Sequence, residues 1–162
     1  MNNRIKLLIV SLAALMSVWG RAAFALDWPP GDGKPLSEIV AMVERLEAGR
    51  IYEAEFDDGL WEVKIRKGNQ FQKIYFAPRS GEEVRRKRVK PDETPPSGAM
   101  ALSAIIRSVE AQSLGVITEA EFEDDFWEVK IYSKREKIKL YINPLSGETV
   151  RQKRKARRLP SP

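Results

Sequence analysis

Apolar and polar residues along this chain follow first a helical and then a strand period. Between positions 36 and 46 apolar residues recur every three or four residues, which predicts an amphipathic helix of about three turns. Gly49 stands where a glycine commonly ends a helix. Between 51 and 76 three stretches alternate apolar with polar residues, which predicts three half-buried strands and leaves room for a short fourth around Val84.

The same succession returns 66 residues further on. The stretch 53–65 recurs almost letter for letter as 119–131, and no gap interrupts the match from Leu36/Leu102 to Arg88/Arg154. Self-similarity of this kind means that one structural unit is used twice. An apolar helix face has to be buried, and the nearest apolar surface is the sheet of the same unit. We therefore predict the α+β class, with two tandem repeats that each pack one amphipathic helix on a three- to four-stranded antiparallel sheet.

Composition divides the chain into six segments. They are a signal peptide (1–25), an extended segment rich in proline and glycine (26–35), the first repeat (36–90), a proline-rich linker (91–99), the second repeat (100–154) and a basic disordered tail (155–162). The first segment has a positive start, an apolar run and a small-x-small site at Ala23-Phe24-Ala25, which predicts export with cleavage before Leu26. An uncleaved anchor is the alternative, although the apolar run is shorter than the roughly 20 residues that span a bilayer.

Net charge and residue types restrict the kinds of functional site that the chain can form. The formal net charge of +5 falls to +2 without the signal peptide, which carries Arg4, Lys6 and Arg21 and no acid. The chain has no histidine, the commonest general base and metal ligand, and no cysteine. The acidic turns at 57–58 and 123–125 lack the ligand spacing of a calcium loop. Ser37 and Ser103 are expected to cap their helices rather than to act as nucleophiles. We therefore expect no enzyme activity, no metal and no cofactor.

The repeats also resemble a known family. A helix, a glycine, an acidic alternating strand, the Trp-x-Val-x-Ile strands 61–65 and 127–131, and the closing turns 78–82 and 144–148 of type Pro-x-Ser-Gly-Glu are similar to the PepSY domain. That module occurs in propeptides of secreted peptidases and in many bacterial cell-envelope proteins. The family often has Asp at the start of the last turn, where this chain has Ala77 and Asn143. The resemblance implies a non-catalytic periplasmic module that binds or restrains other proteins.

Tryptophans in phase with branched aliphatic residues are typical of a core, with ligand stacking as the alternative. The predicted core includes Phe56, Trp61, Val63, Ile65, Phe122, Trp127, Val129 and Ile131. Trp28 lies outside this pattern, in the proline-rich segment. It is expected either to dock onto the first repeat or to anchor a partner.

The opposite sheet face is predicted to be polar and to carry two tyrosines. Its residues are Glu53, Glu55, Glu62, Lys64, Lys73, Tyr75, Glu119, Glu121, Glu128, Lys130, Lys139 and Tyr141. One interpretation is that these charges only pair across the sheet in water. The other is a platform that recognises another periplasmic or membrane-bound protein, such as a peptidase or a sensor, because aromatic residues among polar groups suit a non-obligate interface.

The C-terminal end is strongly basic, through Arg151, Lys153, Arg154, Lys155, Arg157 and Arg158. Behind an export signal, nucleic acid is not an expected partner. The alternative function is therefore attachment to anionic lipid or polymer of the envelope through this tail. A solvated tail without function is the third interpretation.

Overall fold

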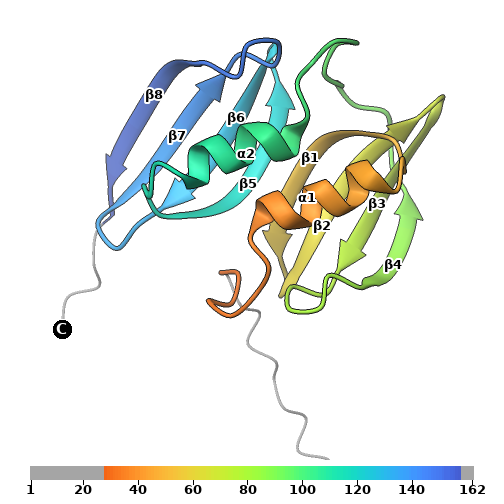
Figure 1. Ribbon diagram of the computed structural model, residues 1–162, viewed down its shortest axis with the longest axis horizontal. Coiled ribbons are helices and arrows are strands. Elements are labelled where there is room, and N and C mark those ends of the chain that lie inside the picture. The colour runs from red at the N-terminus through yellow and green to blue at the C-terminus, as the bar shows by residue number, and fades with distance from the viewer. Residues whose placement is uncertain (1–27, 158–162) are drawn as a thin grey trace, which may run out of the picture.

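One eight-stranded antiparallel sheet forms the centre of the protein in the computed structural model, which describes residues 28–157 (Figure 1). The strand order is β4-β3-β2-β1-β5-β6-β7-β8, so each repeat supplies four neighbouring strands. The strands are β1 (Arg50–Asp57), β2 (Leu60–Lys67), β3 (Gln70–Phe76), β4 (Glu83–Arg88), β5 (Val116–Glu123), β6 (Phe126–Tyr132), β7 (Glu136–Ile142) and β8 (Thr149–Ala156). The α+β class is confirmed, and the strands of the two repeats, whose association the sequence did not specify, form one continuous sheet.

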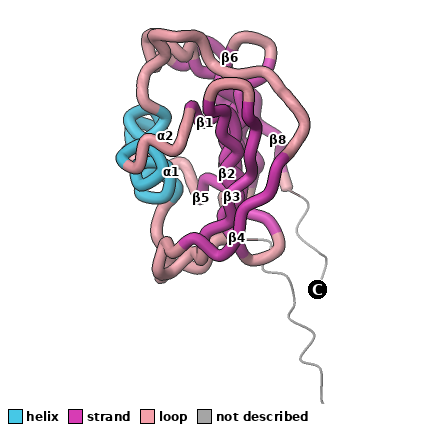
Figure 2. The backbone as a smooth tube through the Cα atoms, turned by 90° about the vertical axis from the view of Figure 1, so that its right-hand side faces the viewer, coloured by secondary structure: helices cyan, strands magenta, loops and turns pink. Residues whose placement is uncertain are grey.

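Both helices cover the same face of this sheet. Helices α1 (Leu36–Arg45) and α2 (Leu102–Glu110) lie next to each other on one side, and the opposite side carries no helix of the described residues (Figures 1 and 2). Each helix buries its apolar stripe, with Ile39, Val40 and Val43 in α1 and their counterparts in α2. The molecule is therefore a two-layer structure with one covered and one uncovered sheet face.

The two repeats meet at a short seam between β1 and β5. Three pairs make this seam: Glu53 opposite Glu121, Ala54 opposite Ala120, and Glu55 opposite Glu119. Because equivalent residues pair antiparallel, the repeats are related by a pseudo-two-fold axis through the alanine pair. Both alanines are fully buried on the helix-covered side.

The core follows the alternation of the strands. All eight side chains assigned to it from the sequence are buried, and they belong to one cluster shared by both repeats. Trp61 meets Phe56 edge to face with ring centroids 5.2 Å apart, and Trp127 meets Phe122 in the same way at 5.7 Å. The duplicated tryptophans therefore lie in the core rather than on a ligand-stacking surface.

The glycine after each helix has a different role from the one expected. Helix α1 is followed by Glu47 in the left-handed region, with a φ of 47°, and Gly49 comes only afterwards with a φ of 148°. A Cβ on Gly49 would lie 2.7 Å from the carbonyl oxygen of Arg66, and one on Gly115 would lie 2.3 Å from that of Tyr132. Each glycine therefore allows the strand to start in close contact with its neighbour.

Two further expectations concern the chain ends. Strand β8 includes Lys155 and Ala156, so the disordered tail predicted from 155 begins too early; the basic residues from Arg151 onward belong mostly to a strand. The predicted signal peptide and residues 158–162 lie outside the described residues. Neither helix of the described range 28–157 is long and apolar enough to cross a membrane.

Candidate functional site

The uncovered face of the sheet collects the twelve polar and tyrosine residues named above, and we call it the outer face. They come from β1, β2 and β3 and from the equivalent β5, β6 and β7. Val63 and Val129 point into the core on the helix-covered side. Because successive side chains of a strand point to opposite faces, their neighbours in sequence lie on the outer face. The helices are all on the other side of the sheet (Figure 2).

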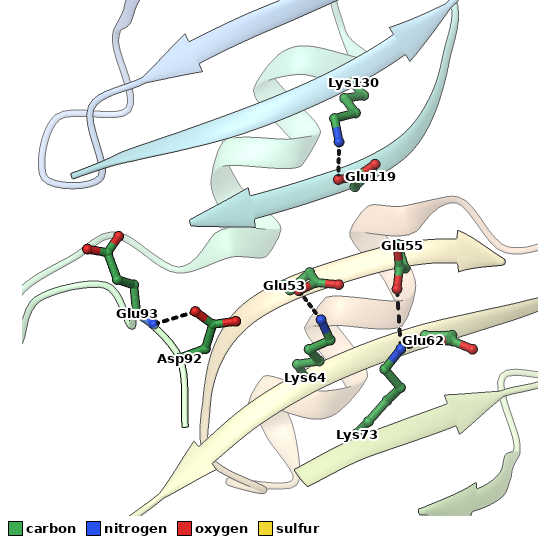
Figure 3. Close-up of polar contacts among 9 residues, drawn as sticks. All are labelled: Glu53, Glu55, Glu62, Lys64, Lys73, Asp92, Glu93, Glu119 and Lys130. Atoms are coloured by element: carbon green, nitrogen blue, oxygen red, sulfur yellow. Dashed lines mark hydrogen bonds and ion pairs between the residues drawn. The ribbon is translucent and has the colours of Figure 1, made fainter. Parts of the chain in front are cut away.

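Ion pairs connect neighbouring strands across this face (Figure 3). In the first repeat Lys64 pairs with Glu53, and Lys73 pairs with Glu62 and, at 3.3 Å, with Glu55. In the second repeat Lys130 pairs with Glu119, while Lys139 lies 2.5 Å from Glu128. The cross-strand pairing that the sequence left as one interpretation is present, so a partner would meet groups that already satisfy one another.

Carboxylates crowd the middle of the outer face. Glu53 faces Glu121, and Glu55 faces Glu119 across the seam. Like charges placed directly opposite each other repel. Burial, only partly offset by the hydrogen bond from Lys64, raises the pKa of Glu53 to about 7. Burial and the nearby Glu119 also raise the pKa of Glu121. Burial and crowding at the seam therefore raise the pKa of carboxylates on both sides of it, Glu53 in the first repeat and Glu121 in the second.

Further from the seam, hydrogen bonds and opposite charges outweigh the effect of burial and favour the charged forms. Burial disfavours the charge of Glu128, but hydrogen bonds from Lys139 and Tyr141 outweigh it and hold the pKa of Glu128 below its usual range. Burial likewise opposes the charge of Lys130, yet Glu119 keeps its pKa above the usual value. These groups remain ionised and fixed in place.

The two tyrosines are less open than the sequence suggested. Tyr75 is 2% exposed, with the guanidinium carbon of Arg85 4.0 Å from its ring centroid. Tyr141 is half-buried, with Arg151 at 3.8 Å. The alternation within each strand placed both rings on the outer face, but by itself it does not show that cations from the edge strands cover them. The signal was available in the repeat itself, since an arginine occupies the same position of both edge strands.

Basic side chains of the edge strands flank the acidic middle. Register places Arg85 beside Tyr75 and Lys87 beside Lys73 at one edge. Arg151 and Lys153 take the equivalent places at the other edge, where Lys155 faces Lys137. The outer face therefore has basic side chains on the edge strand β4, acidic side chains at the seam between β1 and β5, and basic side chains again on the edge strand β8. A partner complementary to it would carry the reverse pattern.

Trp28 docks within the chain, but on the second repeat rather than the first. Its ring lies edge to face against Tyr132 at 5.0 Å, and the Arg157 guanidinium lies 4.9 Å from its centroid. These three residues form part of the lining of a cavity of about 320 Å³, together with Glu55 and Glu119. The segment before each repeat thus contacts the other repeat, since Thr94, the counterpart of Trp28, accepts a hydrogen bond from Arg66 of the first repeat at 3.3 Å.

Helix capping also differs from expectation. Neither helix has a side-chain cap at its N-terminus, where Pro35 and Ala101 stand. The backbone N–H of Ser37 instead donates to Glu110, and that of Ser103 donates to Glu44. The serine hydroxyls are therefore not the caps that the sequence suggested. An acid at the end of both helices, in equivalent positions, was the signal for this arrangement.

The fold and this face define a class: tandem-repeat α+β proteins in which two helices cover one side of a continuous sheet. The family profile described as "Peptidase propeptide and YPEB domain" matches residues 9–87 and again residues 90–153. The chain therefore belongs to the PepSY family, and the resemblance found in the sequence is confirmed.

A solved structure is also similar to this chain. It is a protein of Clostridium difficile 630 assigned as a lipoprotein, which aligns at a TM-score of 0.45 and 11% identity over 73% of this chain and 90% of its own. A search of curated proteins found no match.

Proposed function

We propose that this protein is exported to the periplasm and acts by binding another protein through its outer face. It would thereby inhibit or modulate a peptidase or another envelope or signalling protein. Membership of a family described by peptidase propeptides supports a binding or regulatory role rather than catalysis. The mechanism would be steric, in that the bound module covers or restrains part of its partner.

The observation that carries this proposal is the continuity of the outer face across both repeats. Both described helices pack on the other side of the sheet, over its middle strands, whereas no helix of residues 28–157 packs on this side (Figure 2). Its charge has a regular order: carboxylates face one another at the seam, lysines of the next strands pair with them, and β4 and β8 add further bases. Ordered charge of this kind selects partners and their orientation more than it adds affinity.

Site-specific photo-crosslinking in periplasmic extract tests the proposal. A photoreactive residue replaces Lys87 or Lys153, both exposed on the outer face, in residues 26–162. The matched controls carry it at Glu38 or Arg107, exposed on the helices. We expect one discrete crosslinked protein from the outer-face positions and none from the helix positions.

The outcome that contradicts the proposal is equally specific. Crosslinks of equal yield from the helix positions would show that the outer face is not the binding surface. The absence of any discrete product from Lys87 and Lys153 would remove the protein-binding function as proposed.

A further inference from the structure

The second repeat carries a basic groove at its β7–β8 edge; the lysines that line it lie on the outer face, whereas Arg154, opposite Ile138, comes from the other side of the edge strand. The groove has a volume of about 640 Å³. The lining residues are Lys137, Lys139, Tyr141, Lys153, Arg154 and Lys155. The four lysines form two cross-strand pairs, because Lys137 faces Lys155 and Lys139 faces Lys153. The groove is thus walled by cations from two neighbouring strands.

The first repeat lacks two of these lysines, although it has the same succession of strands. Phe71 and Val89 occupy the positions of Lys137 and Lys155. Phe71 packs edge to face against Tyr52 with centroids 5.8 Å apart, and the backbone N–H of Val89 donates to the Phe71 carbonyl at 3.0 Å. In the first repeat an aromatic contact between Phe71 and Tyr52 therefore stands in place of the Lys137–Lys155 pair.

The lysines of the groove have few internal counter-ions. Lys73, in the first repeat, pairs with two carboxylates, but its counterpart Lys139 pairs with Glu128 alone. Within residues 28–157 no carboxylate oxygen lies within 4.0 Å of the ammonium groups of Lys137, Lys153 or Lys155. Lys137 and Lys153 instead lie over tyrosine rings, 5.1 Å from the centroid of Tyr132 and 5.3 Å from that of Tyr141. Since facing like charges cost stability, a bound anion would relieve a repulsion that no carboxylate of residues 28–157 offsets at Lys137 and Lys155.

We propose that this groove binds a sugar-sized anion that bears two phosphoryl groups. Neighbouring strands are about 4.8 Å apart and two residues along a strand span about 6.8 Å, so the two lysine pairs form two cationic positions about 7 Å apart. Each pair can donate to the oxygens of one phosphoryl group through charge-assisted hydrogen bonds. A sugar ring between the two groups provides the required separation.

A bisphosphorylated sugar fits this surface better than an anionic membrane. The groove occupies only the β7–β8 end of the outer face, and the carboxylates of Glu55 and Glu119 lie further along the same face. A flat anionic bilayer laid on this face would bring its headgroups towards those acids. This inference goes beyond the proposed function, because it concerns a small ligand and involves only one of the two repeats.

Calorimetric titration of residues 26–162 with fructose 1,6-bisphosphate, at low and moderate salt, tests the proposal. Fructose 6-phosphate and vesicles of phosphatidylglycerol are the other two ligands. The variant Lys137→Gln with Lys155→Gln removes one lysine pair, and Lys137→Phe with Lys155→Val reproduces the first repeat. Arg45→Gln with Arg107→Gln removes the same charge from exposed positions on the helices. Thermal unfolding by circular dichroism verifies that each variant is folded.

We expect the bisphosphate to bind at least tenfold more tightly than the monophosphate, because it engages both lysine pairs. Both groove variants should lose at least tenfold in affinity, while the helix variant keeps the wild-type value. Equal affinity for the two sugars, or an equal loss in the helix variant, would overturn the proposal, as would binding to vesicles without binding to the soluble bisphosphate. None of these results bears on the crosslinks from Lys87, so this proposal and the proposed function fail separately.

Discussion

The carboxylate of Glu110, at the end of α2, accepts a hydrogen bond from the backbone N–H of Ser37 in the first turn of α1 at 3.2 Å. Glu44 and Ser103 make the same contact in the other direction, also at 3.2 Å. A carboxylate is unfavourable at the end of its own helix but favourable at the start of another. The two contacts thus offset the unfavourable position of each glutamate at the end of its own helix, and they stabilise the association of the two repeats.

Removing either carboxylate should destabilise the whole fold. We expect Glu44→Ala and Glu110→Ala each to lower the free energy of unfolding by about 1 kcal/mol, the usual effect of losing a helix cap. The contacts lie at opposite ends of the helix pair, so the double variant should lose the sum of the two effects. Urea unfolding followed by tryptophan fluorescence measures all three values.

Ser37→Ala and Ser103→Ala are the controls for this prediction. Their hydroxyls do not cap the helices, so each substitution should cost less than removal of the corresponding glutamate. A larger loss from either serine variant would show that the capping role had been assigned to the wrong side chain.

Stability should depend on pH through Glu53. Its pKa of about 7 in the folded protein lies above the ordinary value of 4.5, so folding favours the protonated form. The folded protein then holds more protons than the unfolded chain between about pH 4.5 and 7, and the free energy of unfolding falls as pH rises through that window. We expect a decrease of about 1–2 kcal/mol between pH 5 and 8 that is reduced in Glu53→Gln.

Two comparisons make this measurement specific. Glu82→Gln, on an exposed turn, removes the same charge and should retain the wild-type slope. Glu128, whose pKa is lowered, acts in the opposite direction and in a lower window, since its contribution is lost only as pH falls below about 4.5. An unchanged slope in Glu53→Gln would show that other groups carry the dependence.

The sequence predicted those features that depend on the residues of a single repeat. Alternation placed Trp61 in the core and Tyr75 on the opposite face, because side-chain direction follows from the period of two. It did not show that Arg85 covers Tyr75, since that contact depends on the register of an edge strand. The pairing of β1 with β5 and the cap from Glu110 were not predictable either, because a pattern within one repeat does not specify what its edge meets.

Gly115→Ala should be strongly destabilising. The added Cβ would lie 2.3 Å from the Tyr132 carbonyl oxygen, and the φ of 149° disfavours a side chain in any case. We expect a loss of about 2–4 kcal/mol, in the range of other severe backbone clashes. Gly31→Ala is the matched control, because nothing lies within 4 Å of its Cβ position, and it should leave the melting temperature nearly unchanged.

The first repeat alone, residues 28–90, should form a homodimer in which two copies of β1 pair as β1 and β5 do in the intact protein. The seam pairs equivalent residues antiparallel, so two copies of β1 can reproduce it with Ala54 facing Ala54 and Glu53 facing Glu55. Glu44 of one copy can then cap Ser37 of the other, as Glu44 caps Ser103 in the intact chain. A free monomer would expose the apolar side of α1 and an unpaired strand edge, which is unfavourable for so small a unit. Analytical ultracentrifugation should find a dimer, and Glu44→Ala should raise its dissociation constant at least threefold. A folded monomer at high concentration would show that the seam contributes little to the stability of each repeat.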